Sequence, residues 1–158
     1  MTIYYHSAPL LLEPGAIIHP GNWGRILNCY TQQQGNPWLL AREFVFESIR
    51  VSEYSDLPSR LSCAFAFETL DHANEYKSNF SPWNPLYEVE LVDAAASVHR
   101  AGFNLVAFPP ANTEFVPVVV GLARKYWRSE EIEVTEILTK SALRVRGLVS
   151  SGPGSYQP

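Results

Sequence analysis

Several features that mark common protein classes are missing from this sequence of 158 residues. Only two cysteines occur, Cys29 and Cys63, without CxxC or metal-ligand spacing, which favours two reduced thiols and action in the cytoplasm. The four histidines are scattered and no HExxH motif occurs, so we expect no metal site. No apolar run approaches membrane-spanning length and no basic stretch precedes one at the start, so we expect neither a membrane span nor a signal peptide.

Nucleotide-binding glycine motifs and an excess of positive charge are also absent. Neither GxGxxG nor GxxxxGK[ST] occurs, which disfavours a doubly wound dinucleotide-binding sheet. The formal net charge of −4 gives no electrostatic reason for non-specific binding to nucleic acid or to an anionic membrane.

What is present is the composition of one folded domain. Hydrophobic residues make up 46% of the chain and aromatic residues 13%, enough for a core and for an aromatic pocket. The length fits a single domain, which we place at residues 1–149. The ending "SSGPGSYQP", residues 150–158, is typical of a flexible tail.

Turn residues and apolar periodicity divide the chain into strands and helices. Helices are expected over residues 37–50, from Thr69 onward with Thr69 as the N-cap, and over 113–128. The first of these follows Asn36 and Pro37, a cap and a first-turn residue, with apolar positions at Trp38, Ala41, Val45 and Ile49. Residues 13–27 are expected to be a loop-rich segment around one short strand at 16–18.

The expected strands are 2–6, the stretch ending near Phe67, "LYEVELV", "SVHRAGFNLVAF", "EVTEILTK" and "ALRVRGLV". Strands outnumber helices and do not alternate with them as βαβ units. The sequence therefore predicts an α+β fold with a mostly antiparallel, split sheet and a few flanking helices.

Two polar residues lie where the pattern is otherwise apolar. His6 ends the first strand, and Glu136 lies inside "VTEILTK". Glu136 either faces solvent on an edge strand or lines a site, because burying an unpaired carboxylate costs several kcal/mol. His6 is either a structural residue or part of the same site.

Three stretches occur in an order that resembles the ADP-ribosyltransferases with a His-Tyr-Glu triad, the branch of diphtheria-like toxins and poly-ADP-ribose polymerases. "YYHSAP" is similar to the His-Gly strand of that family. "AFAFETLDHANEY" resembles its tyrosine strand and helix, and "TEILTKSALRVRGLV" its glutamate strand with a valine-rich partner. The segments "GNWGRIL", "PSRL" and "YEVEL" also resemble small bacterial domains of unassigned function.

This resemblance implies an NAD-dependent transferase, a toxin, effector or housekeeping enzyme that cleaves the nicotinamide-ribose bond and passes ADP-ribose to an unknown acceptor. It implies Glu136 and His6 as catalytic residues, Glu136 as the carboxylate and His6, with Ser7, at the ribose or adenosine. Phe65 and Tyr76 would sandwich the nicotinamide ring.

Arg25 lies in the segment "PGNWGRIL", which as a loop would bring it to a phosphate, unless Trp23 and Ile26 merely anchor the loop to the core. The sequence departs from the family pattern, with serine at Ser7 where the family has glycine and phenylalanine at Phe65 where it has tyrosine.

Two other classes stay open. The departures from the family pattern favour a catalytically inactive domain of the same fold that binds a nucleotide or a protein. A hydrolase using Cys63 or Ser62 is weaker, because no GxSxG or Cys-Gly signature supports it. An arginine acceptor is disfavoured, because Val134 stands where arginine-modifying relatives carry Glu or Gln.

Overall fold

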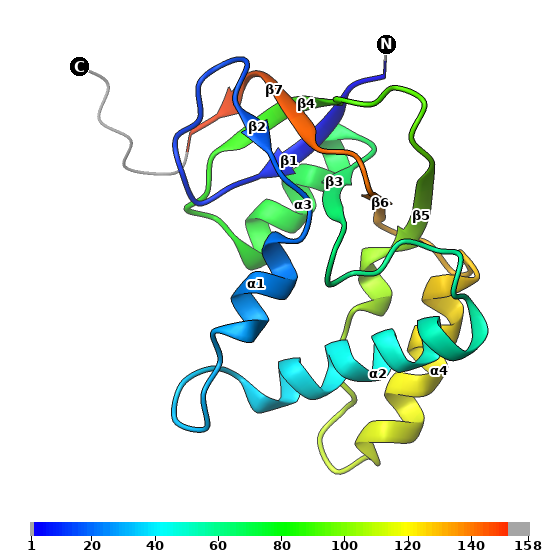
Figure 1. The fold of residues 1–158 in the computed structure, drawn as a ribbon. Coiled ribbons are helices and arrows are strands. Elements are labelled where there is room, and N and C mark those ends of the chain that lie inside the picture. Colours follow the sequence, from blue (N-terminus) through cyan, green and yellow to red (C-terminus); the bar gives the residue numbers. More distant parts are fainter. Residues whose placement is uncertain (1, 152–158) are drawn as a thin grey trace.

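A computed structural model describes residues 2–151, which form seven strands and four α-helices (Figure 1). The strands are β1 (Tyr4–Ser7), β2 (Ile17–Ile18), β3 (Ala64–Phe67), β4 (Leu86–Leu91), β5 (Val98–Gly102), β6 (Thr135–Thr139) and β7 (Leu143–Ser150). The helices are α1 (Asn22–Asn28), α2 (Pro37–Glu53), α3 (Leu70–Phe80) and α4 (Phe115–Trp127), with one 3₁₀ turn at Phe103–Leu105. The predicted α+β fold is confirmed.

All neighbouring strands are antiparallel, in the order β2-β7-β4-β1-β3-β6-β5. Strand β1 pairs with β4 over Tyr4–Ser7 but meets β3 only through Tyr5 and Phe67. The strands therefore form one continuous sheet, not the split sheet predicted, and its shortest pairing is between β1 and β3.

The two faces of the sheet pack against different partners. One face carries a core around Tyr4, Tyr87, Val89 and Ile137, which the segment before β2 covers through Leu12. The opposite face packs against helix α3, and farther along against helices α2 and α4, which lie beside each other (Figure 1).

Helices α2 and α3 begin where the sequence predicts. The side chain of Asn36 accepts hydrogen bonds from the backbone N–H groups of Trp38 and Leu39, and Pro37 occupies the first turn. Thr69 accepts from the N–H of His72 at the start of α3. Local capping chemistry was sufficient to locate both starts.

Two local predictions were wrong. Residues Asn22–Asn28, expected to be loop, form helix α1, which packs so closely on Leu61 that a Cβ at Gly24 would overlap its carbonyl oxygen. In α2, Trp38 is 60% exposed, while Phe46 is fully buried and lies at the centre of the covered face. The apolar spacing therefore identified the helix but not its buried side.

The remaining boundaries differ by small amounts. Strand β5 ends at Gly102, so Phe103–Leu105 is a 3₁₀ turn rather than a continuation of the strand. Strand β7 includes Ser150, one residue beyond the expected end of the domain, and residues 152–158 of the expected tail lie outside the described residues. None of the described helices is both long and apolar enough to cross a membrane.

Candidate functional site

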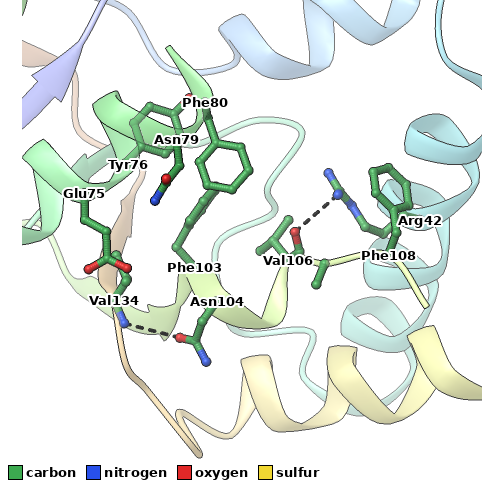
Figure 2. Close-up of a pocket in the computed structure, with 11 residues that line it drawn as sticks. Arg42, Glu75, Tyr76, Asn79, Phe80, Phe103, Asn104, Val106, Phe108 and Val134 are labelled. Carbon is green, nitrogen blue, oxygen red and sulfur yellow. Dashed lines mark hydrogen bonds between the residues drawn. The ribbon is translucent and has the colours of Figure 1, made fainter. Parts of the chain in front are cut away.

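A cavity of about 370 Å³ opens between α3 and α2 and is floored by the segment that follows β5 (Figure 2). Its aromatic walls are Tyr76, Phe80, Phe103 and Phe108. Tyr76 stacks on Phe80 with ring centroids 5.7 Å apart, and Phe103 meets both rings edge to face. Phe80 is 65% exposed, so one wall of the cavity is a ring that solvent or a ligand can reach.

Polar groups lie at two sides of the same cavity, as Figure 2 shows. Glu75 and Asn79 are exposed on α3, whereas Arg42 comes from α2 on the opposite side and is 7% exposed. Asn104 is occupied in holding the chain, since its oxygen accepts from the N–H of Glu133 at 3.0 Å. The cavity thus combines stacking surface with a few polar groups, which is typical of small-molecule sites.

Glu136 lies on the sheet face that carries this cavity. It pairs across the sheet with Phe67, which pairs with Tyr5, and residues paired in this way point to the same face. Strand β6 lies between β3 and β5, and Glu136 is 3% exposed. An exposed position on an edge strand, one of the two sequence-based alternatives, is therefore wrong.

Instead, the Glu136 carboxylate is bound inside the protein. Arg60 Nη1 donates to Glu136 Oε1 at 2.6 Å, and the Tyr126 hydroxyl donates to the same oxygen at 2.6 Å. Arg60 also donates through Nε to Glu43 Oε2 at 2.9 Å. We call Glu43, Arg60, Tyr126 and Glu136 the buried network, because each of the four is 5% exposed or less.

The charged groups of this network shift one another's pKa values. Burial opposes ionisation of Glu43, but the charge and hydrogen bonds of Arg60 outweigh it and lower the pKa of Glu43. Burial likewise opposes the charge of Arg60, but Glu43, Tyr126 and Glu136 raise its pKa well above the usual value. The network therefore contains an arginine that stays charged and a carboxylate favoured in its ionised form.

Tyr76 connects the cavity with the buried network. Burial and the negative charge of Glu136 raise the pKa of Tyr76, which stays a neutral phenol with a proton to donate. Tyr76 also packs on Phe67, the cross-strand partner of Glu136, with ring centroids 4.9 Å apart. Among the predicted site residues, Tyr76 therefore lies near Glu136 through Phe67, and His6 contacts Phe65 separately.

His6 and Ser7 have contacts of a different kind. His6 Nδ1 donates to the Phe65 carbonyl at 2.7 Å. At this point β1 and β3 no longer pair through their backbones, so the side-chain hydrogen bond links the two strands instead. The Ser7 hydroxyl lies 3.1 Å from the Ser81 hydroxyl beyond α3. Because His6 is next to Tyr5 on the strand, it points to the sheet face opposite Glu136.

Arg25 and Phe65 are occupied by neighbours within the chain. Arg25 lies on α1, exposed, and its guanidinium donates to Asn22 Oδ1 at 2.5 Å and to the Pro20 carbonyl at 3.2 Å. The Phe65 ring is covered by the guanidinium of Arg60, whose central carbon lies 4.9 Å from the ring centroid. In this structure Phe65 and Tyr76 therefore do not form a sandwich for a flat ring.

Sequence reasoning missed Arg42, Glu43, Arg60 and Tyr126. Charged residues on a helix are read as solvent-exposed, yet Arg42 and Glu43 lie beside the fully buried Phe46. One signal was available for Arg60, which directly precedes the apolar run "LSCAFAF". A charge at the edge of a buried strand needs a partner, and Glu136 was the unexplained carboxylate.

The described residues give little support to a hydrolase that uses Cys63 as its nucleophile. Within residues 2–151, no three side chains of the His, Cys, Asp and Glu types come together as a metal site. Cys63 is 1% exposed and burial raises the pKa of its thiol, which makes it a poor nucleophile. His72 Nδ1 accepts the N–H of Thr135 at 3.1 Å, a contact between α3 and β6.

Comparison with protein families places most of the chain in one family. Residues 22–150 match the family described as "Protein of unknown function (DUF2441)", from the start of α1 to the end of β7. No curated protein matches. Strand β1, with His6 and Ser7, lies outside the matched segment. Because the matched segment makes up well over half of the 158 residues, the chain belongs to the DUF2441 family of proteins of unknown function.

Proposed function

We propose that this domain binds NAD in the cavity between α2 and α3 and holds it without cleaving it, as a non-catalytic relative of the ADP-ribosyltransferases. The observation that carries the proposal is the aromatic cavity around Tyr76, Phe80 and Phe103, which opens on the same sheet face as Glu136. In this arrangement the nicotinamide ring stacks on the exposed ring of Phe80, which Tyr76 supports from behind.

The chemistry of the cavity suits such a ring. A volume of about 370 Å³ falls in the range of small-molecule pockets and is enough for a nicotinamide with its ribose. Flat heteroaromatic rings gain about 1–3 kcal/mol by stacking on an aromatic side chain. The exposed side chains of Glu75 and Asn79 lie at the rim, where they can accept and donate hydrogen bonds to a carboxamide.

Catalysis is disfavoured by the state of Glu136. Cleavage of the nicotinamide-ribose bond needs a carboxylate against the ribose to stabilise the developing positive charge. Glu136 is 3% exposed, and Arg60 and Tyr126 both donate to its Oε1 atom. Because Arg60 and Tyr126 already neutralise the Glu136 carboxylate, it stabilises a positive charge on a ribose in the cavity only weakly.

The second candidate is an active ADP-ribosyltransferase. The position of Glu136, paired with Phe67 beneath Tyr76, favours it. In that reaction the bond between nicotinamide and ribose C1′ breaks, C1′ bonds to an acceptor nucleophile that loses its proton, and nicotinamide leaves. It requires Glu136 to separate from Arg60 and reach the cavity.

Calorimetric titration of NAD, run beside a nicotinamide-release assay, tests both candidates. The variants are Phe80→Ala, Glu136→Gln and, as a matched control, Trp83→Ala, an exposed aromatic outside the cavity lining. We expect saturable NAD binding by the wild type, weakened about tenfold by Phe80→Ala and unchanged by the control.

The release assay separates the two candidates. We expect no nicotinamide release by the wild type. Release that disappears in Glu136→Gln while NAD binding remains would replace the non-catalytic proposal with the transferase. Absence of NAD binding by the wild type, with the fold verified by circular dichroism, would overturn both.

A further inference from the structure

A second cavity, of about 400 Å³, lies next to the first and shares Phe108 with it as a wall. Its other aromatic walls are Trp38, at the start of α2, and Phe115, at the start of α4. The Trp38 and Phe115 rings lie 5.1 Å apart between centroids, tilted by 48°. Three aromatic side chains from three segments thus surround one space.

Two of these three rings are largely exposed to solvent. Trp38 is 60% exposed and Phe108 is 46% exposed. Large aromatic side chains that gather at the surface around a hollow are typical of binding sites. Trp38 lies in the first turn of α2, two turns before the fully buried Phe46, and at 60% exposure its ring contributes little to the core.

A positive charge lies behind the wall between the two cavities. The guanidinium of Arg42 lies over the Phe108 ring, 4.7 Å from its centroid. Arg42 Nη1 donates to the Val106 carbonyl and Nη2 to Glu43, while Nε has no partner among the described residues. Arg42 is 7% exposed, so its unused donor is held in place beside the first cavity.

Helices α2 and α4 both begin at the second cavity, through Trp38 and Phe115. The Asn36 side chain already accepts from the first N–H groups of α2, and Glu114 is the N-cap residue of α4, so Arg42 is the positive group nearest the shared wall. The two aromatic cavities therefore lie next to each other, with Phe108 as their shared wall and the buried Arg42 behind it.

We propose that the two cavities form one site for a ligand with two flat rings joined by an anionic linker, which is the chemistry of a dinucleotide. The second ring, an adenine, stacks against Trp38, and the phosphates pass over Phe108 above Arg42. This inference rests on the proposed NAD binding and assigns the second cavity, which that proposal leaves unused.

Titration with the two halves of the ligand tests the assignment. Nicotinamide mononucleotide, AMP and NAD are each titrated into the wild type, Trp38→Ala, Phe80→Ala and the control Trp83→Ala. All three side chains are at least 60% exposed, so the variants are expected to fold, which thermal unfolding verifies. Each of Trp38 and Phe80 lines only one of the two cavities.

We expect a crossed pattern. Trp38→Ala weakens AMP about tenfold and leaves nicotinamide mononucleotide within about twofold, whereas Phe80→Ala does the reverse. Both variants weaken NAD about tenfold, since each removes one stacking partner.

Two other results overturn the inference and are distinguishable. If Trp38→Ala leaves NAD and AMP binding unchanged while Phe80→Ala weakens NAD, the second cavity is not part of the site, and the proposed NAD binding stands. If the wild type binds none of the three ligands, the proposed function fails together with the inference.

Discussion

Arg60 and Glu136 meet through a 2.6 Å contact between Nη1 and Oε1, in a region where neither residue is more than 5% exposed. Arg60 lies in the segment before β3, and Glu136 lies on β6. The same guanidinium binds Glu43 on α2 and the Tyr126 hydroxyl on α4. One side chain therefore ties both helices to the sheet.

Replacing Arg60 with leucine is expected to cost about 3–5 kcal/mol of unfolding free energy, because Glu136 loses its charged partner and Glu43 keeps only Arg42. Chemical denaturation at neutral pH measures the loss. The control is Arg124→Ala, which removes a partly exposed ion pair with Glu53 and is expected to cost much less, because water screens exposed charges. Equal costs for the two variants would contradict a central role for the network.

Gly24→Ala is expected to destabilise the protein by about 1–3 kcal/mol, because the added Cβ would overlap the Leu61 carbonyl oxygen and force α1 away. Gly121→Ala is the matched control, since a Cβ at this position on α4 meets nothing within 4 Å. It is expected to stabilise by up to about 1 kcal/mol through helix propensity. Thermal unfolding of both variants gives the comparison, and a neutral Gly24→Ala would refute the close packing of α1.

Acidification is expected to weaken the fold partly through His6. Burial lowers the pKa of His6, although its hydrogen bond to the Phe65 carbonyl opposes the shift. The unfolded chain binds a proton as the pH falls through about 6.5, while the folded protein resists it. The contribution of His6 is therefore complete above this pH and is lost as the pH falls toward the lower folded pKa.

Urea unfolding at pH 7.5 and at pH 5.5 measures this dependence. His6→Asn is expected to show a smaller difference between the two pH values than the wild type. His99, whose pKa is also lowered by burial, contributes in the same direction and keeps part of the dependence. His19→Asn, at an exposed position, serves as the control and is expected to keep the full difference. An unchanged pH dependence in His6→Asn would show that His6 is not the group responsible.

The two cysteines are expected to react at very different rates. Cys29 is exposed, whereas Cys63 is buried and the pKa of its thiol is raised by burial. A thiol reagent added to the native protein is expected to modify Cys29 quickly and Cys63 only after denaturation. Rapid modification of both in the native state would reopen the hydrolase alternative that uses Cys63.

The sequence was informative where structure depends on neighbouring residues. Asn36 with Pro37, and Thr69, located two helix starts through capping chemistry that acts within three residues. The excess of strands over helices led to the α+β class for the same reason, because each element has its own local pattern.

Prediction from sequence failed where the structure depends on contacts between residues that are far apart in the chain. Helix α1 is short and begins after a Pro-Gly turn signal, and its close packing on Leu61 is a contact between separate segments. Glu136 gave a correct signal that a carboxylate in a strand needs an explanation. Its partner Arg60 belongs to a different segment, and only the strand register and the path of the chain bring them together.

The strand order also bears on how fast the protein reaches this structure. Ile17 of β2 pairs with Arg144 of β7, and Tyr5 of β1 pairs with Glu88 of β4, so the sheet joins residues from opposite parts of the sequence. Chains dominated by such distant pairings fold in about milliseconds to seconds, because loop closure costs entropy before the contacts form. We expect stopped-flow refolding in that time range. During that interval the unpaired edges of β4 and β7 are open to other chains, so refolding yield is expected to fall as protein concentration rises.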